Sequence, residues 1–382
     1  MQPLPAPSYS YYDVNKSYAE NLANGPQIEE YPPERDVEKI AHLRTSLFGH
    51  ELNTGLGIAA GPLLDGAYVT ALAKCGFDVL TYKTVRTSKR ECHPAPNCVY
   101  VNTNGPIAVE EIGSELIQQP SAPENMNDIT ITNSFGMPSY DPEVWQADIE
   151  KTNARLGDGQ LMIVSVVGTA PADSEVTGEA DKQDKFFTDF ARCAALANEA
   201  GAKAIEVNFS CPNVKKDTGA LFTQPAASSE IIRRIKKEIG DTPLIVKMGF
   251  FTDLDLMKRV IEANVAAGAN GFCGINTLSM KVYKDESKTE SALPEGIGGF
   301  NRLSSGLCGK GINDRAKDFI NHWNGIAEEL ALQDIPMLNT GGVTTPDDIR
   351  ERLAMGSQVV MSTTGSMWNT NLAYNYYLSE AK

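Results

Sequence analysis

Histidine and paired cysteines are scarce in this sequence. The 382 residues include four histidines and seven scattered cysteines, and no two cysteines have CxxC spacing. A zinc site or a His-based catalytic triad therefore has few residues from which it could be built. We expect no metal site, and the odd number of separated cysteines favours reduced thiols in a cytoplasmic protein.

Basic residues are also in short supply. Lys and Arg number 34 against 49 Asp and Glu, which gives a formal net charge of −15 and a pI of about 4.8. This balance counts against nucleic acid as the main partner, because no large basic surface is expected. It still allows a local basic pocket for an anionic small molecule.

Long apolar runs and targeting signals are absent as well. No window of 18 uninterrupted apolar residues occurs, so no membrane span is predicted. The first 26 residues have neither the charged and apolar regions of a secretory signal nor the Arg-rich character of a transit peptide. A cytoplasmic location without membrane attachment is the resulting expectation.

From about residue 56, short apolar runs alternate with amphipathic stretches, and no GxGxxG motif follows the first run. Continuous apolar character is typical of parallel strands covered on both faces. Eight such units predict a (β/α)₈ TIM barrel in preference to a doubly wound open sheet. The predicted strands lie in 55–61, 78–84, 161–168, 202–210, 243–249, 271–277, 335–342 and 358–364, and the clearest helices in 184–202, 228–240, 252–269 and 345–356.

Three segments do not fit a minimal barrel. Residues 90–139 contain β-like pieces and turns, and residues 277–312 are predicted to form a long loop rich in Gly, Ser and Lys. Long insertions at the carboxyl ends of barrel strands are where binding sites lie. Residues 1–50 are rich in Pro and Tyr and are predicted to be an arm that wraps the surface or a partner, with the barrel domain in 51–382.

Two pairs of residues near the last two strands predict a phosphate site. Gly341 and Gly342 allow close approach of the backbone, and Thr363 and Thr364 supply hydroxyls and amides where the final helix starts. Loops seven and eight of these barrels commonly bind phosphate. The alternative is an ordinary glycine turn and a threonine helix cap.

Other strand ends carry lysine, asparagine and one thiol. Lys83 and Lys247 end apolar strands and either reach the rim or face an anionic ligand. Asparagine offers a donor and an acceptor, which match the edge of a pyrimidine-like ring. Cys211 lies past a strand end in a polar loop, where a thiolate could act as base or nucleophile. The other cysteines interpreted as buried apolar residues are Cys75, Cys98, Cys193, Cys273 and Cys308.

Seven motifs in this order resemble those of the class 1 dihydroorotate dehydrogenases. They are YKTV, TNSFGMPS, VNFSCPN, IVKM, GINT, NTGGV and MSTTG, and the resemblance runs from about Gly55 to the carboxyl terminus. It implies a soluble FMN enzyme on a (β/α)₈ barrel that oxidises dihydroorotate in pyrimidine biosynthesis. It also implies a homodimer, and the NSFGMP form implies the type that uses fumarate as electron acceptor.

The resemblance implies roles for individual residues. Cys211 matches the catalytic base, which takes a proton from dihydroorotate while a neighbouring carbon passes hydride to the flavin. The implied substrate contacts are Lys83, Asn133, Phe135, Gly136, Met137, Asn208, Asn213, Asn276 and Thr277. The implied FMN contacts are Ala60, Gly61, Lys83, Thr84, Asn208, Lys247, Ile275, Gly306, Gly341, Gly342, Thr363 and Thr364.

The sequence departs from the family pattern at several places. Phe135 stands where methionine is usual and Thr277 where serine is usual, and residues 304–309 are a loose form of a Gly-rich flavin loop. The arm and the segment around residues 170–184 are additions. These departures leave two alternatives open: an FMN oxidoreductase of another dihydropyrimidine or cyclic imide, and a non-catalytic FMN-binding barrel that acts as an assembly partner.

Overall fold

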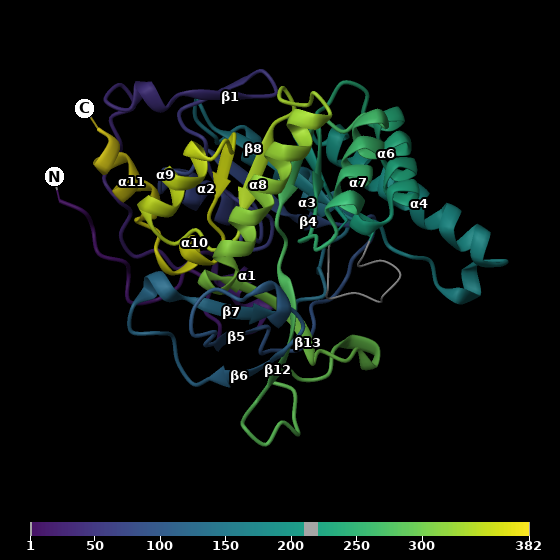
Figure 1. Cartoon of the computed structure of the whole chain (residues 1–382), viewed down its shortest axis with the longest axis horizontal. Coiled ribbons are helices and arrows are strands. Elements are labelled where there is room, and N and C mark those ends of the chain that lie inside the picture. Colours follow the sequence, from purple (N-terminus) through teal and green to yellow (C-terminus); the bar gives the residue numbers. More distant parts are fainter. Residues whose placement is uncertain (1, 210–220, 382) are drawn as a thin grey trace.

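The computed structural model describes residues 2–209 and 221–381, and its central element is a closed barrel of eight parallel strands (Figure 1). Every strand overlaps one of the eight predicted apolar runs, so the predicted TIM barrel is confirmed and the open sheet is wrong. Seven of the eight strands are buried along their whole length, as expected for strands covered on both faces. The strands are β3 (Leu56–Ile58), β4 (Val79–Val85), β8 (Leu161–Val166), β9 (Ala204–Asn208), β10 (Leu244–Lys247), β11 (Gly271–Gly274), β14 (Met337–Thr340) and β15 (Val359–Met361).

Helices surround the barrel, and their ends follow local sequence signals. At α9, Thr345 caps the helix by accepting from the Asp348 amide, and Pro346 occupies its first turn. None of the helices in the described ranges is both long and apolar enough to cross a membrane. The helices are α2 (Gly66–Lys74), α3 (Pro142–Asn153), α4 (Glu179–Glu199), α6 (Pro225–Ile239), α7 (Leu254–Ala266), α8 (Asn313–Glu329), α9 (Pro346–Ala354), α10 (Thr364–Trp368) and α11 (Leu372–Glu380).

A second, five-stranded barrel lies at one end of the first, below it in Figure 1. Its strands are β5 (Cys98–Val101), β6 (Glu115–Gln119), β7 (Thr130–Asn133), β12 (Leu278–Tyr283) and β13 (Ser304–Gly309). The prediction of a long loop over 277–312 is wrong, because β12 and β13 lie within it. These strands pair with β6 and β7 of the other insertion, more than 130 residues away in the chain.

The amino-terminal arm has structure at both ends of the barrel. Its helix α1 (Tyr18–Asn24) lies on the side of the small barrel, whereas β1 (Thr45–Leu47) lies at the opposite end (Figure 1). The hairpin of β1 and β2 (His50–Leu52) closes that end, because Leu47 and Leu52 pack into the barrel interior. The hairpin crosses residue 50, and the division into an arm and a barrel domain at this position stays a prediction.

Short 3₁₀ helices occur in the connections between these elements. They cover Ala41–Leu43, Val109–Glu111, Met126–Asp128, Asp173–Glu175, Leu221–Thr223, Ile297–Gly299 and Lys310–Ile312.

Candidate active site

A cavity of about 140 Å³ opens at the carboxyl ends of the barrel strands, where the small barrel and α10 meet them. Parallel strands of a barrel all end on this face, so loops from distant parts of the sequence converge there. The structure brings twelve of the predicted site residues to its wall. They are Ala60, Gly61, Asn133, Phe135, Lys247, Ile275, Asn276, Thr277, Gly341, Gly342, Thr363 and Thr364.

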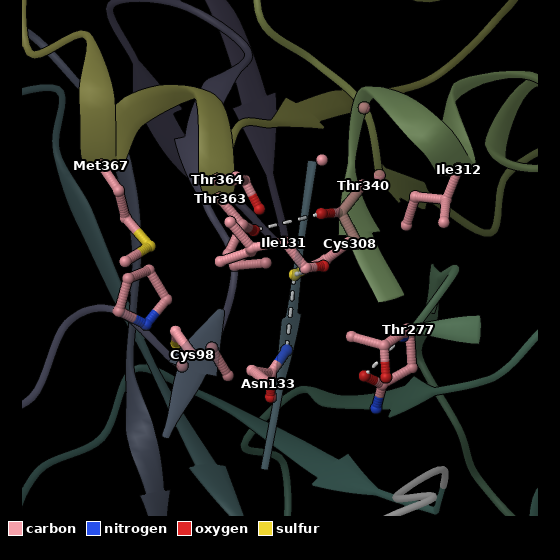
Figure 2. Close-up of a pocket in the computed structure, with 18 of the residues that line it drawn as sticks. Cys98, Ile131, Asn133, Thr277, Cys308, Ile312, Thr340, Thr363, Thr364 and Met367 are labelled. Carbon is pink, nitrogen blue, oxygen red and sulfur yellow. Dashed lines mark hydrogen bonds between the residues drawn. The ribbon is translucent and has the colours of Figure 1, made fainter. Parts of the chain in front are cut away.

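One side of the cavity is formed by backbone at the ends of β14 and β15. Gly341 and Gly342 have φ angles of +119° and +75°, and a Cβ at Gly342 would lie 2.5 Å from Asn313 Cα. Glycine is therefore required at position 342 by both backbone conformation and space. Figure 2 shows Thr340 and Thr363 beside each other across this side, with their hydroxyl oxygens 3.4 Å apart.

The hydroxyl of Thr364 is buried on the same side, and the Cys308 thiol lies near it, although no hydrogen bond of normal geometry forms within the described part of the chain. A buried hydroxyl without a partner costs free energy unless a ligand or water satisfies it. This side can therefore accept a polar group that approaches the backbone closely.

Asn339, which the sequence also places at the end of β14, does not face the cavity. Its side-chain amide donates to the carbonyl oxygens of Gly274 and Ala316 at 3.1 and 2.9 Å. Its side-chain oxygen accepts from the buried guanidinium of Arg352 at 2.8 Å. Asn339 therefore ties β14 to β11 and to the surrounding helices and is not available to a ligand.

Asn133 ends β7 and extends from the small barrel into the cavity. Its side-chain amide donates to Gly306 O at 3.3 Å and to Cys308 Sγ at 3.4 Å, and the second contact is drawn in Figure 2. Both partners lie on β13, which pairs with β7. The pairing of two distant insertions thus sets the orientation of this amide.

A second group of amides comes from the main barrel. Asn276 Nδ2 donates to Asn208 Oδ1 at 3.3 Å, and Asn208 Nδ2 lies 3.9 Å from Met137 Sδ. Asn276 also accepts from the backbone amide of Thr277 at 2.9 Å. Several donors and acceptors from the end of β9, the segment after β11 and the loop after β7 therefore lie together beside the cavity.

Lys247 lies at the end of β10, where its side chain is buried and donates to Cys273 Sγ at 3.2 Å. Burial disfavours the charged form, but the sulfur of Cys273 and the carboxylate of Glu206 outweigh burial and raise the pKa of Lys247. The cavity wall therefore includes an ammonium group that Glu206 helps to keep charged. An electron-rich or anionic group is the natural ligand for it.

Lys83, on β4, is also buried but does not line the cavity directly. Its Nζ lies 4.8 Å from the centre of the Tyr18 ring and 5.8 Å from that of Phe135. Phe135 itself lines the cavity. Lys83 thus lies beside two aromatic rings, one of which comes from the arm.

The remaining predicted residues surround the cavity without lining it. The Thr84 hydroxyl lies 3.0 Å from that of Ser165. A Cβ at Gly306 would lie 2.3 Å from Thr277 Oγ1, and a Cβ at Gly136 would lie 2.7 Å from a ring atom of His93. The predicted base Cys211 and the predicted ring contact Asn213 lie outside the described residues.

Several residues of the cavity wall have no signal in the sequence. Ile131, Ile312 and Met367 form its apolar parts, and Tyr12 enters from the arm. Cys98 and Cys308 also line it, although burial raises the pKa of both thiols and keeps them protonated. Their prediction as buried apolar residues is confirmed, as it is for Cys75, Cys193 and Cys273.

No group of three or more His, Cys, Asp or Glu side chains among residues 2–209 and 221–381 is arranged to hold a metal ion. The polar wall of the cavity instead consists of amides, hydroxyls, glycine backbone and one lysine. Such a set binds planar polar organic groups and anions by hydrogen bonding.

A family model and two curated relatives carry the same family description. A family model described as dihydroorotate dehydrogenase matches residues 42–375. A dihydroorotate dehydrogenase of Dictyostelium discoideum is 36% identical over 372 residues, which cover 96% of both chains. The catalytic subunit of dihydroorotate dehydrogenase B (NAD(+)) of Maridesulfovibrio salexigens is 31% identical over 180 residues, covering 47% of this chain and 53% of that one.

Among solved structures, that of DHODH from Eimeria tenella in complex with ferulenol is similar with a TM-score of 0.67. The sequence identity is 17%, and the alignment covers 92% of this chain and 86% of that one. At this identity the likeness supports the fold.

Proposed function

The chain belongs to the dihydroorotate dehydrogenase family, flavin-dependent oxidoreductases of pyrimidine biosynthesis, and we propose that it is a class 1 enzyme that uses FMN to oxidise (S)-dihydroorotate. One observation carries this proposal. Amides of Asn133 and Asn276, the ammonium of Lys247 and the Gly341–Gly342 backbone line the same cavity. These groups match a pyrimidine ring on one side and a flavin phosphate on the other.

The residues of the cavity fit FMN. The buried hydroxyl of Thr364, with Thr363 and the two glycines, would hold the phosphate. The charged Lys247 would lie at the pyrimidine end of the flavin ring, and Ala60, Gly61 and Ile275 would pack against it. Thr84 and Gly306 complete the proposed flavin contacts. When bound, FMN supplies the acceptor for a hydride.

The proposed reaction removes a proton and a hydride from adjacent carbons of dihydroorotate and leaves orotate with a new carbon–carbon double bond. Cys211 would take the proton as a thiolate, and bound FMN would supply the acceptor for the hydride. Asn133, Asn208, Asn213 and Asn276 hold the ring, and Thr277, Gly136 and Met137 lie around it. Lys83 provides positive charge where substrate and flavin meet.

The electron acceptor in this proposal is fumarate, which would reoxidise the flavin and leave as succinate. The NSFGMP sequence at residues 133–138 supports this type. We also propose a cytoplasmic homodimer, as the resemblance to class 1 enzymes implies. Turnover with fumarate or NAD⁺, together with the mass in solution, tests these points.

The decisive experiment is the absorbance spectrum of the purified protein before and after anaerobic addition of dihydroorotate. We expect a flavin spectrum that loses its visible absorption as the flavin is reduced. Protein that contains FMN but is not bleached would contradict the proposed substrate. Dihydrouracil should be tested in the same assay as an alternative substrate. Phe135 lines the cavity at a position where the family usually has methionine, and this change could alter which dihydropyrimidine is bound.

The role of Cys211 gives a second test. Replacing Cys211 with Ala removes the proposed base, so FMN should stay bound while turnover falls by about 10²-fold or more. Cys75→Ala is the matched control, because burial raises the pKa of that thiol to about 12 and keeps it protonated. Equal rates of flavin reduction in the two variants would exclude Cys211 as the base.

A further inference from the structure

The amino-terminal arm reaches the candidate active site with two tyrosines. Tyr12 lines the cavity, and its hydroxyl is buried without a hydrogen-bond partner in the described part of the chain. Tyr18, in the first turn of α1, lies with its ring 4.8 Å from Lys83 Nζ. A segment that the sequence presents as an addition to the barrel thus contributes to the wall of the site.

Tyr12, Tyr18 and Phe135 form an aromatic group that we call the aromatic cradle. The ring centre of Phe135 lies 5.9 Å from that of Tyr12 and 6.2 Å from that of Tyr18, at interplanar angles of 81° and 69°. Edge-to-face pairs of this kind are favourable and directional. Because Phe135 also lies 5.8 Å from Lys83 Nζ, the ammonium contacts two rings of the cradle.

The arm is firmly attached where it carries the cradle. Ser17 and Glu20 cap α1 reciprocally, and Tyr68 donates to the carbonyl oxygen of Asn21 at the other side of the helix at 2.8 Å. The backbone amide of Tyr11 donates to Met367 O at 3.0 Å, which joins the arm to α10. Tyr12 and Tyr18 therefore occupy defined positions relative to the cavity.

A ring face stabilises an ammonium group without cancelling its charge, as a paired carboxylate would. Burial keeps the pKa of Tyr18 well above its ordinary value, so the ring stays a neutral phenol. Lysine has a long flexible side chain, and ordering it costs conformational entropy. Packing against two rings restricts the positions that the ammonium can occupy.

We propose that Tyr18, supported by Phe135, is a positioning residue that fixes the ammonium of Lys83 where substrate and flavin meet. The inference rests on the proposed function for the role of Lys83, although the placement of the side chain is independent of it. It also gives the arm and the unusual Phe135 a common purpose. Tyr18, which the arm supplies, and Phe135, which stands where the family usually has methionine, both pack against the ammonium of Lys83.

Three variants test the proposal, each assayed as the FMN-loaded full chain. Tyr18→Leu removes the ring, and Tyr18→Phe keeps the ring without the hydroxyl. Tyr31→Leu is the matched control, because Tyr31 is an arm tyrosine whose ring lies 5.8 Å from Lys74 Nζ, outside the site. Flavin reduction at saturating dihydroorotate should slow about tenfold in Tyr18→Leu, recover to within about twofold in Tyr18→Phe and be unchanged in Tyr31→Leu.

A second measurement separates this proposal from the proposed function. Acylation of Lys83 by an amine-reactive reagent, followed by peptide mass spectrometry, should be several-fold faster in Tyr18→Leu than in Tyr18→Phe or Tyr31→Leu. If the parent protein fails to react with dihydroorotate but this difference appears, the substrate is wrong and the positioning role stands. The positioning role of the ring is wrong if Lys83 is acylated at the same rate in Tyr18→Leu and in the parent. It is also wrong if flavin reduction is as slow in Tyr18→Phe as in Tyr18→Leu.

Discussion

At the scale of single residues, His93 shows how a neutral imidazole supports the loop next to the cavity. It is 4% exposed and lies parallel to the Phe300 ring, with ring centres 5.3 Å apart. Its Nδ1 accepts from the backbone amide of Ile297 at 3.1 Å, and Gly136 packs directly against its ring. The acceptor role requires an unprotonated Nδ1, so His93 must stay neutral for this packing to persist.

His93 gives a prediction for the pH dependence of stability. Burial, with repulsion from Arg302 and Arg90, lowers its pKa to about 4, against about 6.5 in an unfolded chain. Its contribution is therefore complete above about pH 6.5 and is lost as the pH falls toward about 4. In His93→Asn, which keeps an acceptor but cannot titrate, the thermal midpoint should drop less between about pH 7.5 and about pH 5 than in the parent. Equal drops would contradict the assigned protonation state.

Single residues also show what the sequence can and cannot reveal about the site. Lys247, Asn276 and Gly342 were predictable because each lies at or just past the end of an apolar strand, and all strands of a parallel barrel end on one face. Asn133 lies on β7 of the small barrel, and only the family resemblance pointed to it. Tyr12 was not, since its position depends on the path of an irregular arm. The same limit applies to Asn339, because the direction of a strand-end side chain is decided by partners such as Arg352.

At the scale of elements, the hairpin of β1 and β2 acts as a plug for the barrel. Leu47 and Leu52 are 1% and 2% exposed and join the cluster of side chains that fills the barrel interior. The cavity lies at the opposite ends of the strands. The hairpin should therefore affect stability without affecting the chemistry of the site.

Leu47→Ala tests this separation. Removing a buried leucine side chain should lower the free energy of unfolding by about 2–5 kcal/mol, while the dissociation constant for FMN stays unchanged. The control Val144→Ala, on α3 at 52% exposure, should change the free energy of unfolding by no more than about 0.5 kcal/mol. Urea unfolding and FMN titration supply the two measurements. Weaker FMN binding in Leu47→Ala would show that the two ends of the barrel are coupled.

Elements differ in how far their sequences define them. The eight barrel strands were predictable because each carries its own apolar run and is followed by a helix. β12 has the alternating pattern LSMKVY, which is typical of a strand but is short and lies in a segment rich in Gly, Ser and Lys that was interpreted as a loop. β13 pairs with β7, which is distant in the chain, so the sequence did not show that the two insertions form one closed barrel.

At the scale of the whole molecule, Arg35 joins the arm to two segments of the barrel domain that are far apart in the sequence, one before β4 and one in α11. The guanidinium of Arg35 binds both carboxylate oxygens of Asp78, directly before β4, with one distance of 2.8 Å. It also donates to Gly76 O at 2.9 Å and lies 4.8 Å from the Tyr377 ring of α11. Asp78 is fully buried, and burial raises its pKa, so its charge depends on these partners.

Arg35→Met should therefore lower the free energy of unfolding by about 3–5 kcal/mol, because it leaves a buried carboxylate without its cation. The double variant Arg35→Met with Asp78→Leu should recover part of this loss, since no unpaired charge remains. Lys39→Met is the control, because its pair with Asp36 spans 3.4 Å and is more than half exposed, and it should cost no more than about 1 kcal/mol. Urea unfolding of the four proteins measures these differences. If Arg35→Met costs no more than Lys39→Met, the arm is not anchored through this pair, and its tyrosines must be held at the site by the contacts of α1 and Tyr11.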